Sequence, residues 1–286
     1  MLSFYLLPSL GVLLALRWGA IDLSVWAVSG LGGVTAAGLL HLGVGFAGAM
    51  LASGLVGAGV GAIHGLCVAR LRIPSPIVTL ITGGAIVLAM RIALDVRTVD
   101  APAGAFDAWL GWLPDGRLDG NSPLVLSRPF LLRLLVVAGF YLAAMGVVSA
   151  ACSLSHGRTD RLPQSCGLWV VLVVSGMLAG LAGAIWLLEY GTAPVPRRPI
   201  GDLRILAAAI LSGAALYRGR WRVLLAMLCL PAAVVAATLW QLEVVLPPVI
   251  GYPLQMPLLI AVTVLVQLLI AGIASGHRRG EGIGAA

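Results

Sequence analysis

The sequence predicts an all-α membrane protein, a polytopic bundle of about nine transmembrane helices. Of its 286 residues, 60% are hydrophobic and 10% are charged, whereas soluble domains are about 45–50% apolar and about 25% charged. The apolar residues gather in nearly uncharged runs of roughly 20 residues, the length with which a helix crosses lipid. These runs are continuous in Leu, Ala, Val and Gly, whereas a membrane barrel would show short alternating strands.

Nine apolar runs account for the expected helices of a single domain, 1–286. The first run begins without a basic region, so it is expected to remain in the mature protein and not to be cleaved as a signal peptide. The longest connection, 97–129, is rich in Trp and Pro and is expected to form an external loop at the lipid surface. The runs are 2–16, 24–40, 44–69, 77–94, 130–151, 168–189, 203–216, 223–246 and 253–273.

The placement of arginine predicts the orientation of the chain. If the connection after residue 69 is cytoplasmic, simple alternation puts ten of the eighteen basic residues on that side, in short loops and in the tail 275–286. The positive-inside rule requires this agreement, and it explains the net charge of +7 better than binding to nucleic acid does. The N-terminus is therefore predicted to be external and the C-terminus cytoplasmic.

Glycines recur at helical spacing in two of the runs. One run carries Gly54, Gly57 and Gly61, and another carries Gly176, Gly180 and Gly183. Small residues three or four positions apart let helices approach closely in lipid, so we expect these glycines to pack helices together.

Enzyme motifs are absent from the sequence. It contains no H-E-x-x-H, no G-x-S-x-G and no nucleotide-binding phosphate loop, so no catalytic residue is predicted and any ATP and Mg²⁺ would be bound by a partner chain. The four cysteines show no metal-ligand spacing, and no metal site is predicted. We expect them to be reduced, small apolar residues.

Three polar residues within or between apolar runs are candidates for a translocation path: Asp22, Ser24 and His64. An ionised carboxylate at mid-depth costs about 2.5–3.5 kcal/mol on insertion scales, so Asp22 must lie at an interface, be paired or face water. The alternative for Asp22 or Ser24 is a helix N-cap. The alternative for His64 is a hydrogen bond to a neighbouring helix.

Three separated blocks carry a family resemblance. GAIDLSV at 19–25 is similar to the GGIDLSVG signature of the ribose-type sugar permeases of ATP-binding-cassette importers. GAIHGLCVARLRIPSPIVTL at 61–80 resembles the family's next block, with His64 at the position of an Asn, and SGMLAGLAGAI at 175–185 resembles a third. The family usually has ten helices, so nine would follow if its first helix were missing here.

The resemblance implies a permease subunit that passes a small polar solute, such as a sugar or a nucleoside, across the bacterial plasma membrane. Its expected partners are ATPase subunits, an extracytoplasmic solute-binding protein and a second permease subunit, identical or related. The alternatives are a secondary carrier or channel without an ATPase, and a structural half of a heterodimeric permease.

Two polar segments are the expected docking sites. The connection 153–167 occupies the place of the family's ATPase-coupling segment, although its arginines could instead only fix the topology; its candidates are His156, Gly157, Arg158, Thr159, Asp160 and Arg161. On the external side, Arg197, Arg198 and Asp202 are expected to receive the solute-binding protein, with Arg204 also facing outward. These arginines could equally pair with acids of the same chain.

Overall fold

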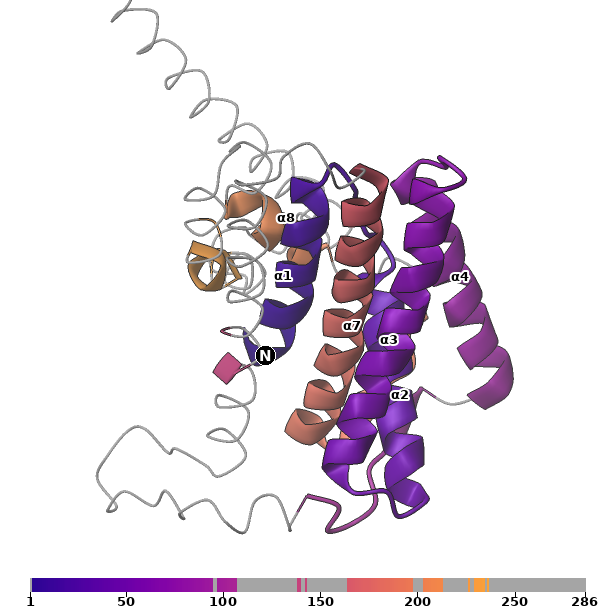
Figure 1. The fold of residues 1–286 in the computed structure, drawn as a ribbon. Coiled ribbons are helices and arrows are strands. Elements are labelled where there is room, and N and C mark those ends of the chain that lie inside the picture. The colour runs from indigo at the N-terminus through magenta and orange to yellow at the C-terminus, as the bar shows by residue number, and fades with distance from the viewer. Residues whose placement is uncertain are drawn as a thin grey trace, which may run out of the picture.

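The structure is a computed structural model that describes residues 2–94, 97–106, 138, 139, 142, 164–197, 203–212, 226, 229–234 and 236. These residues form a bundle of helices with one small sheet (Figure 1). The elements are α1 (Leu2–Arg17), α2 (Val25–His41), α3 (Phe46–Ala69), α4 (Ser75–Leu94), β1 (Thr98–Asp100), α7 (Gln164–Tyr190), β2 (Thr192–Pro194) and α8 (Arg204–Leu211). Five of the predicted runs match α1 to α4 and α7 to within about one turn, and α8 covers the start of a sixth.

Helix α7 is the centre of the described bundle, because α1, α2 and α3 all pack against it (Figure 1). The apolar core lies where α1 and α2 meet α7. Leu10 and Leu13 of α1 are buried there against Leu178 and Ile185 of α7 and Val28 of α2. Apolar faces of α1, α2 and α7 thus form the inside of the bundle.

The interface between α3 and α7 is built from glycines. A Cβ atom at Gly57 would collide with the carbonyl oxygen of Gly176, and one at Gly180 would collide with that of Ser53. Gly61 is equally close to the backbone of α7 at Leu172. The predicted role of the two glycine series in helix packing is confirmed, since no larger residue fits at this spacing.

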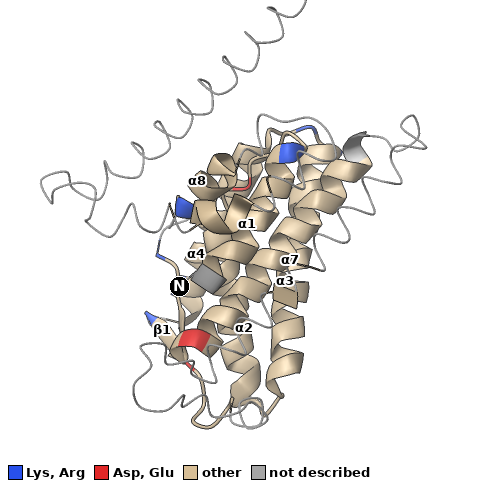
Figure 2. Ribbon diagram, turned by 90° about the vertical axis from the view of Figure 1, so that its left-hand side faces the viewer, with Lys and Arg blue, Asp and Glu red and all other residues tan. Residues whose placement is uncertain are grey.

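The outward faces of α3 and α4 are strongly apolar. Leu55 is 72% exposed and Ile92 is 76% exposed, and both belong to rows of exposed Leu and Ile. Within the described residues, three helices are long and apolar enough to cross a membrane, namely Phe46–Ala69, Ser75–Leu94 and Cys166–Tyr190, while α1 and α2 are apolar but shorter. Figure 2 shows how few charged residues the described helices carry. Lipid is the solvent that suits such a surface, so the chain is a helical membrane protein.

In the described part of the chain, three connections predicted to share one side lie at one end of the bundle, namely those after α1, before α4 and before α7. The chain after α1 and the chain before α4 are joined there, because the amide of Ile21 donates a 3.0 Å hydrogen bond to the hydroxyl of Ser75. The ring of Trp18 lies against Gly167 at the start of α7. The arrangement agrees with the predicted alternation of these helices.

The opposite end carries a feature that an all-α prediction does not contain. Strands β1 and β2 pair antiparallel, with Thr98 opposite Pro194 and Asp100 opposite Thr192. The end of α2 contacts β1, since His41 Nε2 lies 3.0 Å from the carbonyl oxygen of Asp100. The all-α prediction is therefore corrected by one small sheet, which forms because the chain leaves α7 at Gly191, where φ is +69°, and returns beside residues 97–100.

The structure also differs from the prediction within two loops. Because α7 begins at Gln164, the last four residues of the predicted connection 153–167 are helical. The predicted external loop 97–129 begins with β1, and its residues beyond 106 lie outside the described part of the chain. The predicted tail 275–286 and the run 253–273 lie outside it as well.

Candidate functional site

The chain is not helical between α1 and α2, and this break lies inside the bundle. Helix α1 ends in a turn in which the amide of Ala20 bonds the carbonyl oxygen of Ala15 at 2.9 Å, with Gly19 at a φ of +78°. The segment 20–24 then runs back between the helices, and α2 begins beside the middle of α7 (Figure 1). Unwound backbone is tolerated at such a depth only where protein or water satisfies its polar groups.

Asp22 holds the break together. Its Oδ1 accepts hydrogen bonds from the amide of Ser24 at 3.0 Å and from the hydroxyl of Ser24 at 2.7 Å. Its Oδ2 accepts one of 2.8 Å from the hydroxyl of Ser175, on α7. Asp22 is only 3% exposed, so the carboxylate is buried but partnered on both oxygens.

The N-cap alternative is wrong in its simple form. Ser24 is the N-cap residue of α2, but it makes no side-chain hydrogen bond to the first turn of that helix. Asp22 bonds Ser24 itself, two residues on, as an Asx turn does, and it also reaches a different helix. The carboxylate therefore fixes the start of α2 from outside the helix.

Two hydroxyls of α4 satisfy the backbone of the break. The amide of Ile21 bonds Ser75 Oγ at 3.0 Å, and the amide of Leu23 bonds Thr79 Oγ1 at 3.2 Å. Both hydroxyl-bearing residues are buried. The sequence analysis missed Ser75, Thr79 and Ser175 as site residues; for the first two, the signal was the hydroxyls at turn spacing in SPIVT, 75–79, where an apolar run begins.

His64 lies in the same cluster. The ring is fully buried on α3, and its Nε2 bonds the hydroxyl of Thr82 on α4. The hydrogen bond to a neighbouring helix, expected as one alternative, is confirmed. The residue after Thr82, Gly83, lies against Ser24, and Ser24 is hydrogen-bonded to Asp22. The structure thus brings the three predicted path residues together.

The predicted docking residues are only partly described. Arg197 is exposed just after β2, at the same end as Arg97, whose carbonyl oxygen accepts a 2.9 Å hydrogen bond from Val195. Arg198, Asp202 and all six candidates from His156 to Arg161 lie outside the described residues.

Arg204 has a partner that the sequence did not indicate. Its guanidinium lies 4.4 Å from the ring centroid of Tyr5 on α1 and donates a hydrogen bond to the Tyr5 hydroxyl. The planar cation stacks on the ring, so Arg204 packs against an aromatic residue of the same chain.

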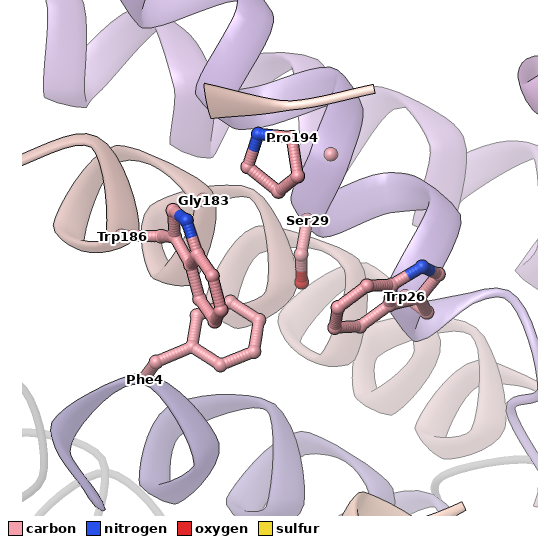
Figure 3. Close-up of a pocket in the computed structure, with 7 residues that line it drawn as sticks. Phe4, Trp26, Ser29, Gly183, Trp186 and Pro194 are labelled. Carbon is pink, nitrogen blue, oxygen red and sulfur yellow. The ribbon is translucent and has the colours of Figure 1, made fainter. Parts of the chain in front are cut away.

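An aromatic group that the sequence analysis missed packs α1, α2 and α7 together. Phe4, Trp26 and Trp186 contact one another edge to face, with ring centroids 4.6 Å apart for Phe4 and Trp186 and 6.0 Å apart for Phe4 and Trp26. They line a pocket together with Ser29 and Pro194 (Figure 3), and it has room for roughly one water molecule. The walls are apolar, so the described pocket is a gap in packing and offers a polar solute no partners.

Clusters of metal ligands are not found in the described ranges. No three His, Cys, Asp or Glu side chains come together there. The cysteines within these ranges, Cys67, Cys166 and Cys229, are free thiols.

Apolar helices, a glycine-packed interface and a polar break inside the bundle define a helical membrane protein with a polar site in its interior. The chain belongs to the family described as "branched-chain amino acid transport system / permease component", whose model matches residues 1–145. The resemblance to sugar-type permeases of ATP-binding-cassette importers is confirmed. Proteins of this kind are transport subunits, and the ATPase is a separate subunit.

Two curated relatives extend the match beyond residue 145. The chain is 28% identical over 225 residues to the ribose import permease protein RbsC of Escherichia coli strain K12, covering 75% of this chain and 67% of that protein. It is 26% identical over 235 residues to the autoinducer 2 import system permease protein LsrC of Yersinia pestis strain Pestoides F, covering 78% of this chain and 63% of that protein. No solved structure matches. These relatives give no support to the carrier, channel or structural-half alternatives.

Proposed function

We propose that this chain is the membrane-spanning permease subunit of an ATP-driven importer and forms the translocation path for a small polar solute, a sugar or a nucleoside-like molecule. The observation that carries the proposal is the buried polar cluster at the break between α1 and α2, in a chain that belongs to a permease family. Bundle interiors hold such groups at a cost, and in membrane proteins they mark solute and ion paths.

The solute class rests on two relatives and on the chemistry of the cluster. One relative is named for the import of ribose and the other for the import of autoinducer 2. Asp22, Ser24 and His64 supply hydrogen-bonding groups, which suit a hydroxylated solute better than an apolar one. We place the path along these residues.

The architecture proposed for the whole domain, 1–286, has about nine spans in the bacterial plasma membrane, with an external N-terminus and a cytoplasmic C-terminus. The loop 97–129 is external, whereas the connection 153–167 and the tail 275–286 are cytoplasmic. The clustering of the connections after α1, before α4 and before α7 at one end supports the alternation.

The proposed partners follow from the permease role. A pair of ATPase subunits binds ATP and Mg²⁺ and docks on the segment from His156 to Arg161. A solute-binding protein docks on the opposite end, at Arg197, Arg198 and Asp202. A second permease subunit, identical or related, completes the importer.

Co-purification and uptake test the proposal together. The chain is expressed with the products of its neighbouring genes, purified in detergent and reconstituted, and uptake of labelled pentoses, hexoses and nucleosides is measured with and without ATP. We expect a phosphate-loop ATPase to co-purify and uptake to require ATP. Arg158→Ala with Arg161→Ala should release the ATPase, whereas Arg278→Ala with Arg279→Ala, the same loss of charge in the tail, should not. Uptake driven by an ion gradient without ATP would contradict the proposal.

A further inference from the structure

Nearly every buried polar side-chain atom in the described ranges has a hydrogen-bond partner. Asp22 is bonded on both oxygens, and the hydroxyls of Ser24, Ser75 and Thr79 are each engaged at the break. Within these ranges two buried atoms have no partner, Ser9 Oγ and His64 Nδ1. A serine hydroxyl in a helix can rotate toward a carbonyl oxygen of the preceding turn, but an imidazole nitrogen has no such choice. His64 Nδ1 is therefore the atom that lacks a ligand.

The hydrogen bonds of Thr82 favour one tautomer of His64. The Thr82 hydroxyl has one hydrogen, and two carbonyl oxygens of its own helix are in reach of it, that of Val78 at 2.9 Å and that of Thr79 at 3.3 Å. When the hydroxyl donates to either of them, the ring donates the contact between His64 Nε2 and Thr82 Oγ1. In the neutral ring the proton on Nε2 leaves Nδ1 as a bare acceptor, so its partner must supply an O–H or N–H group.

The surroundings of His64 limit the kind of donor. The ring belongs to the cluster at the break. Its partner Thr82 is followed by Gly83, and a Cβ atom at Gly83 would lie only 3.3 Å from Ser24 Cα. Among the described residues, the acid that belongs to this cluster is Asp22, through its hydrogen bonds with Ser24. Because that carboxylate is already satisfied by Ser24 and Ser175, a neutral donor such as a hydroxyl fits without competing for it.

We propose that His64 is a solute-contacting residue, whose Nδ1 accepts a hydrogen bond from a hydroxyl group of the transported solute. The inference rests on the proposed function and divides the work within the cluster. Asp22 and Ser24 position the break, and Thr82 orients the His64 ring by its hydrogen bond to Nε2. His64 then accepts a hydrogen bond from a hydroxyl of the solute. A water molecule offers the same O–H chemistry, so the test must distinguish the two sources.

Nitrogen NMR of the histidine rings tests the inference directly. The permease is labelled with ¹⁵N-histidine, purified with its partners in lipid nanodiscs, and the His64 signals are assigned by their loss in His64→Gln. We expect a protonated Nε2 and a bare Nδ1, and we expect the Nδ1 signal to move when the solute taken up in the uptake assay is added. A protonated Nδ1 without solute, or an Nδ1 signal that shows a hydrogen bond to water alone and ignores the solute, would overturn the inference.

Uptake of deoxy analogues gives a second readout. Wild-type permease should take up the analogue that lacks one particular hydroxyl roughly tenfold less efficiently, because Nδ1 is then left unpaired. His64→Leu should remove this preference, and Thr82→Val should weaken it while Thr82→Ser preserves it. His41→Leu, at the exposed end of α2, is the matched control and should leave the preference unchanged.

The two proposals fail in different ways. If no solute is taken up with ATP by the wild-type complex, the proposed function is wrong and the inference falls with it. If uptake is driven by ATP but His64→Leu lowers the uptake of every analogue by the same factor, the importer stands and the contact at His64 does not.

Discussion

The carboxylate of Asp22 accepts a 2.8 Å hydrogen bond from the hydroxyl of Ser175, which lies 153 residues further along the chain. Both residues are buried, and Ser175 sits near the middle of α7. This contact fixes where α2 begins relative to the central helix. It lets an unwound segment lie inside the bundle, because the acid that would be costly there is satisfied by its neighbours.

Ser175→Ala is expected to destabilise the protein by about 1–3 kcal/mol, because it leaves one oxygen of a buried carboxylate without a partner. Thermal unfolding in detergent should show a lower Tm. Ser29→Ala is the matched control: that serine is also buried, but its hydroxyl bonds only the carbonyl oxygen of Val25 in its own helix. Equal losses for the two variants would mean that the contact with Asp22 contributes nothing.

Asp22→Asn is expected to keep most of the stability that Asp22→Ala loses. The amide oxygen of Asn can accept both bonds from Ser24, and its NH₂ group can donate to the Ser175 hydroxyl, which is able to accept. The alanine variant removes all three bonds and should unfold at a clearly lower temperature. A large loss in the asparagine variant would show that the negative charge itself is needed for the fold.

Thr79→Val is expected to cost about 1–3 kcal/mol, since valine has the same shape but leaves the amide of Leu23 without an acceptor. The midpoint of thermal unfolding measures the effect. Thr35→Val provides the comparison, because the Thr35 hydroxyl bonds only the carbonyl oxygen of Leu31, four residues earlier. A smaller shift at Thr79 than at Thr35 would argue against the role of α4 in holding the break.

The sequence predicted the helices well and the connections poorly, for a physical reason. A helix in lipid satisfies its own backbone, so an uncharged apolar run is enough to locate α3, α4 and α7. The small sheet depends instead on residues 98–100 and 192–194 meeting across the chain. No local pattern records that pairing.

The candidate site shows the same division. Asp22 is conspicuous in the sequence because a carboxylate between apolar runs demands an explanation. Its partner Ser175 is not, because a serine in a transmembrane helix commonly bonds its own backbone. Arg204 was expected to pair with acids or with a partner protein, and its contact with the ring of Tyr5 was not predicted. Contacts between side chains of different helices cannot be predicted from the sequence of either helix alone.

Gly57→Ala is expected to lower the stability of the bundle by several degrees in Tm, because the new methyl group would meet the carbonyl oxygen of Gly176. The helices must separate to admit it, and lipid offers little apolar driving force to hold them together again. Gly59→Ala is the control on the same helix, since a Cβ there has open space around it. If both variants unfold at the wild-type temperature, the close approach of α3 and α7 is not what holds them together.

Single cysteines introduced as Leu71→Cys, Arg158→Cys and Leu42→Cys report the orientation when they are labelled with a reagent that does not cross membranes. We expect the cysteines at 71 and 158 to react from the cytoplasmic side and the cysteine at 42 to react from the external side. Leu71 and Leu42 are 62% and 79% exposed at opposite ends of the bundle, so a cysteine at either position should react readily. The native cysteines are first replaced by serine, and intact cells are compared with inverted vesicles. The physical basis is the gathering of arginines in the short connections, which fixes orientation during insertion. If Leu71 and Leu42 exchange sides, the orientation is inverted while the bundle stands. If Arg158 reacts from the side opposite to Leu71, the number of spans between them is odd, and the segment 153–167 cannot meet a cytoplasmic ATPase.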